Sequence, residues 1–144
     1  MKKIQFMIAL PVFALLGCRH HHTEEGHHHD LVKRQYSVYT PEMEMFAEAD
    51  PFVAGESTRV LVHLTSLPEF QPVESRSVTL IISSEKEEVR QSVEKGLKQG
   101  IYEFHLKPGF PGTALMKVVV QSGDRNLMTE VPGEIGRASC RERV

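Results

Sequence analysis

Cysteine is scarce in this chain, and the common signatures of catalytic sites are missing from it. Only two cysteines, Cys18 and Cys140, occur among the 144 residues. Each lies in a terminal segment unlike the rest of the chain, so we expect no disulfide inside a folded domain. The sequence contains no glycine-rich phosphate loop, no nucleophile elbow and no His-Glu-x-x-His pair. An enzymatic function is therefore not expected.

The N-terminal apolar run is too short to span a membrane. It covers residues 4–16 and contains Pro11, whereas a membrane-spanning helix needs roughly 20 apolar residues. Two lysines precede the run, as is typical of a secretory signal peptide over residues 1–17. Leu-Leu-Gly before Cys18 resembles a bacterial lipobox, in which the new N-terminal cysteine carries a diacylglycerol. We expect a periplasmic protein anchored to a bacterial membrane by a lipid on Cys18; an ordinary signal peptide with an incidental cysteine is the alternative.

The last eleven residues, EIGRASCRERV, do not continue the pattern that precedes them. Back-translated from Ile135, they resemble a common sequencing-adapter oligonucleotide read in frame. We interpret residues 134–144 as a non-native, adapter-derived tail and the chain as the front of a longer protein; a genuine basic tail is the alternative. Residues 19–134 carry 12 Lys and Arg against 18 Asp and Glu, a formal charge of −6. This acidic balance disfavours nucleic acid as a partner.

Histidine is the residue that points most directly to a function. Six of the eight histidines form two triplets, and acidic residues are interleaved with them. The candidate metal ligands are His20, His21, His22, His27, His28, His29, Glu24, Glu25 and Asp30. Neutral imidazole suits zinc, copper(II), nickel and cobalt, and Gly26 lets the chain bend around one ion. An affinity tag and a solvated polar spacer are the alternatives.

Residues 18–37 hold little apolar surface, so we interpret them as a disordered, flexible tether that carries the histidines. Residues 38–133 alternate between apolar and polar positions, with turn clusters every 8 to 12 residues. Strands are predicted over residues 42–48, 58–65, 77–83, 88–93, 101–106, 113–121 and 126–131. Over residues 113–121 either Leu115 and Val119 or the residues of the opposite register face inward, and this choice stays open. The pattern predicts an all-β fold, an immunoglobulin-like antiparallel sandwich of about six to seven strands.

A few side chains in the predicted sandwich have possible metal-binding roles. Met43 and Met45 share one face of a strand, and thioethers bind copper(I), but methionines at this spacing are more typical of a core. His63 and His105 fall on the faces opposite their buried neighbours, so we expect partly exposed surface positions and no ligation. Tyr102 and Phe104 are expected to pack in the core and at its edge.

Several short runs, ordered along the chain, match a known family. They are Tyr39-Thr40-Pro41, VLVHLTSL at 60–67, FQPV at 70–73, GIYEF at 100–104 and PGFPG at 108–112. Together with the signal, the cysteine and the His-rich segment, they resemble the N-terminal region of periplasmic adaptor subunits, or membrane fusion proteins, of heavy-metal efflux pumps of the resistance-nodulation-division class. The likeness covers nearly all of residues 1–133.

The resemblance implies an anchored periplasmic protein that bridges an inner-membrane pump and an outer-membrane channel. In metal-exporting members of the family, such a subunit hands the ion to the pump. The family's lipoyl, barrel and helical-hairpin regions have no counterpart in this sequence, which agrees with truncation. A free-standing periplasmic metal-binding lipoprotein, acting as a chaperone or a sensor, fits the same features and stays open. A hydrolase fragment whose catalytic part lies downstream is a third reading.

Overall fold

The computed structural model describes residues 32–138, and within that range the protein consists of strands with no helix. No segment of this range is a helix with the length and apolarity to cross a bilayer. The strands are β1 (Arg34–Tyr39), β2 (Met43–Ala49), β3 (Phe52–Val53), β4 (Thr58–Ser66), β5 (Gln71–Pro72), β6 (Ser77–Ser83), β7 (Glu88–Val93), β8 (Ile101–Leu106), β9 (Gly112–Ser122) and β10 (Arg125–Gly136).

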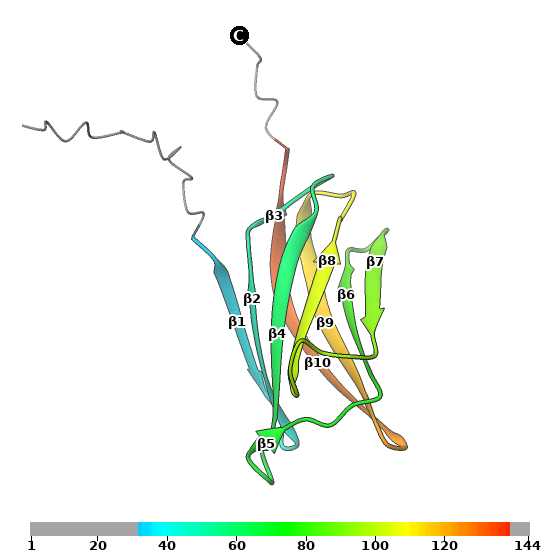
Figure 1. Ribbon diagram of the computed structural model, residues 1–144. Coiled ribbons are helices and arrows are strands. Elements are labelled where there is room, and N and C mark those ends of the chain that lie inside the picture. Colours follow the sequence, from blue (N-terminus) through cyan, green and yellow to red (C-terminus); the bar gives the residue numbers. More distant parts are fainter. Residues whose placement is uncertain (1–31, 139–144) are drawn as a thin grey trace, which may run out of the picture.

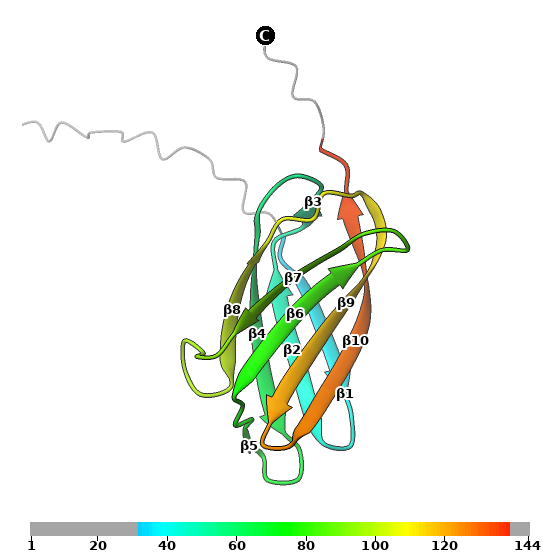
Figure 2. The same cartoon turned by 90° about the vertical axis from the view of Figure 1, so that its right-hand side faces the viewer.

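The strands form two sheets that pack face to face (Figure 1). In the first sheet β1, β2 and β4 are successive neighbours, and β4 also pairs with β5 and β8. The second sheet has the order β3-β10-β9-β6-β7, and β7, β6, β9 and β10 cross in front of the first sheet in Figure 2. All pairs are antiparallel except β3 with β10. If the edge strand β1 and the two-residue strands β3 and β5 are set aside, seven strands remain. They divide into one sheet of β2-β4-β8 and another of β10-β9-β6-β7, which is an immunoglobulin-like arrangement. The predicted fold class is confirmed.

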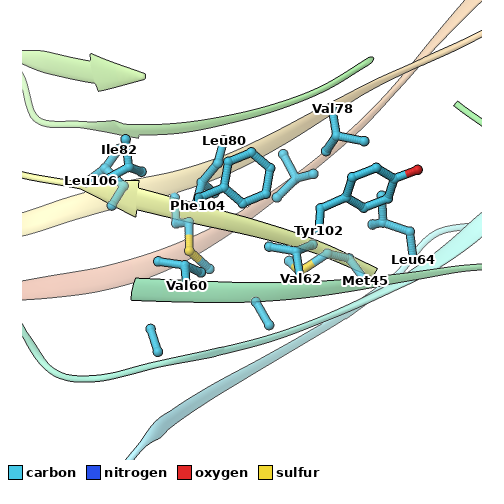
Figure 3. Packing of buried hydrophobic residues seen from close by; sticks show 14 of the residues in the cluster. Met45, Val60, Val62, Leu64, Val78, Leu80, Ile82, Tyr102, Phe104 and Leu106 are labelled. Carbon is cyan, nitrogen blue, oxygen red and sulfur yellow. The ribbon is translucent and has the colours of Figure 1, made fainter. Parts of the chain in front are cut away.

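The core lies between the sheets and is built from the inward side chains of every second residue. Figure 3 shows side chains of β4 and β8 pointing toward those of β6. Met43 and Met45 are fully buried, and Tyr102 and Phe104 are buried as well. The predictions that these four residues belong to the core are confirmed.

The inward face of β9, which the sequence left open, consists of Ala114, Met116, Val118 and Val120. The pairing with β6 decides this choice. Val118 lies opposite Leu80 in the ladder, so both side chains project from the same face of the sheet. Because Leu80 is fully buried, the Val118 set faces the core and the alternative set faces outward.

The boundary expected between tether and sandwich differs from the structure. Strand β1 begins at Arg34 and pairs with β2 from Arg34 opposite Ala49 to Tyr39 opposite Glu44, whereas the domain was expected to begin at residue 38. The tether prediction over residues 18–37 is therefore wrong for residues 34–37. The physical reason is that β1 is an edge strand: Tyr36 and Val38 are half-buried against the core, and the polar residues between them face outward.

The C-terminal boundary also differs. Strand β10 continues through Gly136, although residues from 134 onward were set aside as a non-native tail. Ile135 is buried and pairs in parallel with Phe52 of β3, which is buried too. Residues 134–136 extend the alternation of β10, and the inward Ile135 side chain covers apolar surface at that end of the core. Cys140 lies outside the described residues.

Gly100 is held where a side chain does not fit, at the start of β8. Its φ is 72°, and a β-carbon there would lie 2.7 Å from Cβ of Pro72 and 2.8 Å from the carbonyl oxygen of Leu64. We expect Gly100→Ala to lower the free energy of unfolding by about 2–4 kcal/mol, through backbone strain and overpacking. Urea unfolding of both proteins measures the change.

Gly123→Ala is the matched control. Gly123 has a φ of 58°, but a β-carbon at this position would have no other atom within 4 Å. Only the backbone strain, about 1–2 kcal/mol, is expected there. Equal losses in the two variants would show that the contact with Pro72 and Leu64 contributes nothing.

Candidate functional site

The residues predicted to bind metal or lipid precede the described part of the chain. Residues 32–138 contain neither Cys18 nor any of the nine candidate ligands between His20 and Asp30. What the structure does place is the point where the segment that carries them joins the sandwich.

The histidine segment joins the domain at one end of the first sheet. Lys33, directly before β1, forms an ion pair of 3.2 Å with Asp50, which directly follows β2. Asp30, the last candidate ligand, precedes Arg34 by four positions in the sequence and lies outside the described residues. The start of β1 and the end of β10 both lie toward the upper end of the sandwich in Figure 1. The outer face of the first sheet at this end is formed by the start of β1, the end of β2, the start of β4 and the end of β8.

Three polar side chains form a connected group on that surface. Arg59 of β4 donates from Nε to Oε2 of Glu103 on β8, at 2.8 Å. His105, two residues further along β8, has its Nε2 atom 3.1 Å from the other carboxylate oxygen, Oε1 of Glu103. All three project away from the core, because they alternate with buried neighbours on their strands.

The electrostatics of this group follow from the pairing. The hydrogen bonds from Arg59 and then from His105 hold the pKa of Glu103 below its ordinary value. The same carboxylate raises the pKa of Arg59, first through the hydrogen bond and then through its charge. Because the group is exposed to solvent, its contribution to stability is small. The contact holds Nε2 of the His105 ring beside Oε1 of Glu103.

His105 is also fixed through its backbone. The main-chain N–H of His105 donates to the side-chain oxygen of Gln91 on β7, at 2.7 Å. This hydrogen bond joins the neighbouring edges of the two sheets. The imidazole itself remains accessible, with 56% of the side chain exposed.

His63 has a different environment on the same outer face. Its ring packs edge-on against Phe46, with 5.7 Å between the ring centroids and 64° between the ring planes. His63 lies opposite Ile101, whereas His105 lies opposite Arg59, so the two histidines are four ladder positions apart, about 13 Å. The prediction that both occupy partly exposed surface positions is confirmed. Within residues 32–138, no group of three or more His, Cys, Asp or Glu side chains is arranged to hold a metal ion.

Two of the surface depressions in the described part of the chain have apolar or acidic linings. One, of about 690 Å³, lies between the β6–β7 turn and the loop before β9, with Phe110, Leu115 and Pro132 among its lining residues. The other, of about 590 Å³, has three carboxylates, those of Glu42, Glu69 and Glu74, with a single Arg125. Neither contains a histidine or a cysteine.

Sequence reasoning missed the group formed by Arg59, Glu103 and His105. The signal was present in part, because Glu103 and His105 are two residues apart and so share a face of their strand. Nothing local shows that Arg59 lies opposite His105, since this depends on the register between β4 and β8. Comparison of the chain with protein-family models, with curated proteins and with solved structures finds no match.

Proposed function

We propose that this protein is a lipid-anchored periplasmic metal-binding protein, specifically the N-terminal part of an adaptor subunit of a heavy-metal cation efflux pump. Its His-rich segment captures a divalent ion such as zinc, copper(II), nickel or cobalt, and the sandwich holds that segment in place. The pump in the inner membrane and the channel in the outer membrane are the proposed partners.

The observation that carries the metal-binding part is the density of imidazoles next to a folded domain. Six histidines and three carboxylates occupy residues 20–30, and the first strand begins at Arg34. Borderline divalent ions prefer imidazole nitrogen, and the carboxylates add negative charge that favours a cation. Few residues separate these proposed ligands from Arg34, where the first strand begins.

The adaptor assignment rests on the sequence resemblance. A free-standing periplasmic metal chaperone or sensor has the same anchor, the same segment and the same sandwich, so it is the alternative. The two functions differ in what the gene encodes beyond this region. Sequencing the genomic DNA beyond the codon of Glu134 distinguishes the two functions. A downstream region that encodes a long helical hairpin supports the adaptor, whereas a stop codon near Gly133 supports the chaperone or sensor.

The lipid anchor gives a direct test of localisation. We expect Cys18→Ser to move the protein from the membrane fraction to the soluble periplasmic fraction, because the thiol that receives the diacylglycerol is lost. Fractionation followed by immunoblotting measures the shift, and metabolic labelling with a fatty acid shows whether lipid is attached. A wild-type protein already found in the soluble fraction would contradict the anchor.

A further inference from the structure

We propose that the end of the sandwich at which β5 lies is a docking surface for a cationic, partly apolar segment of a partner protein. The β1–β2, β4–β5 and β9–β10 turns meet at this β5 end, which lies away from the start of β1 and the end of β10 in Figure 1. Its central residue is Phe70, in the turn between β4 and β5. The inference goes beyond metal binding and depends only on residues 32–138.

Phe70 is an exposed aromatic residue in a backbone conformation that residues with a β-carbon rarely adopt. It is 77% exposed, and its φ of 51° is the single positive value among the non-glycine residues of the described range. A positive φ brings the β-carbon close to the backbone, and an exposed ring leaves apolar surface in water. Neither feature helps the domain to fold. Local costs of this kind, combined at one residue, are typical of functional positions.

The turn that carries Phe70 is held in place by hydrogen bonds. The main-chain N–H of Leu67 donates to the carbonyl oxygen of Glu42, at 3.0 Å, which ties this turn to the β1–β2 turn. Within the turn, the hydroxyl of Ser66 donates to the carboxylate of Glu69. The ring is therefore presented from an ordered backbone. Such preorganisation lowers the entropic cost of binding, and aromatic side chains of this kind dominate many protein interfaces.

A depression of about 590 Å³ lies directly beside Phe70, because both of its chain neighbours, Glu69 and Gln71, line it. Residues from all three turns of the β5 end contribute to the lining. Its apolar part consists of Pro68, Pro72, Val73 and Leu127. A peptide segment that lies across Phe70 can thus bury an apolar side chain in the depression, while the ring of Phe70 is covered at the same time.

The charge of the depression indicates which kind of partner fits. Its lining includes Glu42, Glu69 and Glu74 against the single Arg125, a formal charge of −2. Within residues 32–138, none of these carboxylates is ion-paired with a lysine or an arginine. The surface therefore attracts lysine and arginine side chains. It repels anionic phospholipid and a second copy of the same end, so a cationic protein segment is the partner that matches.

Leu97 provides the comparison. It is another exposed apolar residue, at 61%, but it lies in the loop before β8 between Lys95 and Lys98. It lines a different depression, which includes both lysines. Cationic neighbours repel a cationic segment, so Leu97 is not expected to contribute to docking.

Selection of random short peptides displayed on phage, against the full chain in mild detergent, tests the proposal. The chain carries Cys18→Ser and Cys140→Ser, so that no thiol captures a peptide. We expect the selected peptides to be enriched in apolar residues next to lysine or arginine. A fluorescent copy of the most enriched peptide then serves as the probe, and its binding is expected to weaken as the salt concentration rises.

Variants locate the binding site of this probe. We expect Phe70→Ala to weaken binding about 10-fold, as for a residue central to an interface. The double variant Glu69→Gln and Glu74→Gln is expected to weaken it several-fold at low salt and less at high salt. Leu97→Ala is the matched control and is expected to leave the affinity unchanged.

Phe70→Gly separates docking from a structural role. Glycine adopts a positive φ without strain, so this variant is expected to keep its thermal midpoint and lose probe binding as Phe70→Ala does. A midpoint lowered by many degrees would show that the ring stabilises the fold, and would overturn the docking role.

Other outcomes would also overturn the proposal. These are a selection without cationic, apolar peptides, and a probe whose affinity is the same in Phe70→Ala. Sedimentation that shows a Phe70-dependent dimer would assign the surface to a second copy instead. Phe70-dependent binding to phosphatidylglycerol vesicles would assign it to a membrane. Each result leaves the proposed metal-binding function untouched, because the β5 end contains none of its candidate ligands.

Discussion

Phe104→Ala is expected to lower the free energy of unfolding by about 3–5 kcal/mol, the usual cost of truncating a buried phenylalanine. Phe104 is fully buried in β8, and it belongs to the core cluster that joins the inward side chains of both sheets (Figure 3). Small domains are stable by only about 5–15 kcal/mol, so this one change removes a large share of the total. Urea unfolding followed by circular dichroism measures it.

Phe46→Ala is the matched control for this prediction. Phe46 is a half-buried residue on the outer face of β2, where it contacts His63 and not the core. Its loss is expected to cost roughly 1 kcal/mol, because less apolar surface is removed from water there. If the Phe104 variant does not fold, Phe104→Leu provides a milder version. A loss in the Phe104 variant no larger than that in the Phe46 variant would contradict the packing described above.

The strands could be predicted from the sequence wherever alternation and burial agree. All seven predicted strands are present, because each places apolar residues on one face, as with Val78, Leu80 and Ile82 in β6. Strand β1 was missed because an edge strand needs only two half-buried residues, Tyr36 and Val38. The two-residue strands β3 and β5 are too short to show any period.

The candidate site was less predictable, because it depends on which strands pair and in what register. The metal-binding composition of residues 20–30 is visible in the sequence itself. The neighbourhood of His105 is not, since Arg59 and His105 are separated by 46 positions in the chain and meet only through the β4–β8 ladder. Strand pairing at such separation is set by the packing of the whole core, and no local pattern encodes it.

Replacing all six histidines of residues 20–29 with alanine is expected to abolish stoichiometric binding of divalent metal. The substituted residues are His20, His21, His22, His27, His28 and His29. The change removes every imidazole of residues 20–30 and leaves Glu24, Glu25 and Asp30 as the only candidate ligands there, and carboxylates hold these ions weakly. Elemental analysis after loading with zinc and dialysis measures the bound metal per chain.

Imidazole ligation also fixes the direction of the pH dependence. A metal ligand must be a neutral imidazole, and the ordinary pKa of histidine is about 6.5. Protons therefore compete with the metal as the pH falls, so binding is expected to be clear at about pH 7.5 and largely lost by about pH 5. Binding that is equally strong at both values would exclude imidazole as the main ligand.

Calorimetric titration of the full chain with zinc, copper(II), nickel and cobalt tests metal capture by the histidine segment most directly. The parent and the six-alanine variant, both carrying Cys18→Ser and Cys140→Ser, are compared at neutral pH. We expect micromolar binding of at least one of these ions by the parent and none by the variant. Micromolar binding that survives the loss of all six histidines would place the site elsewhere and contradict the assignment of metal capture to residues 20–30.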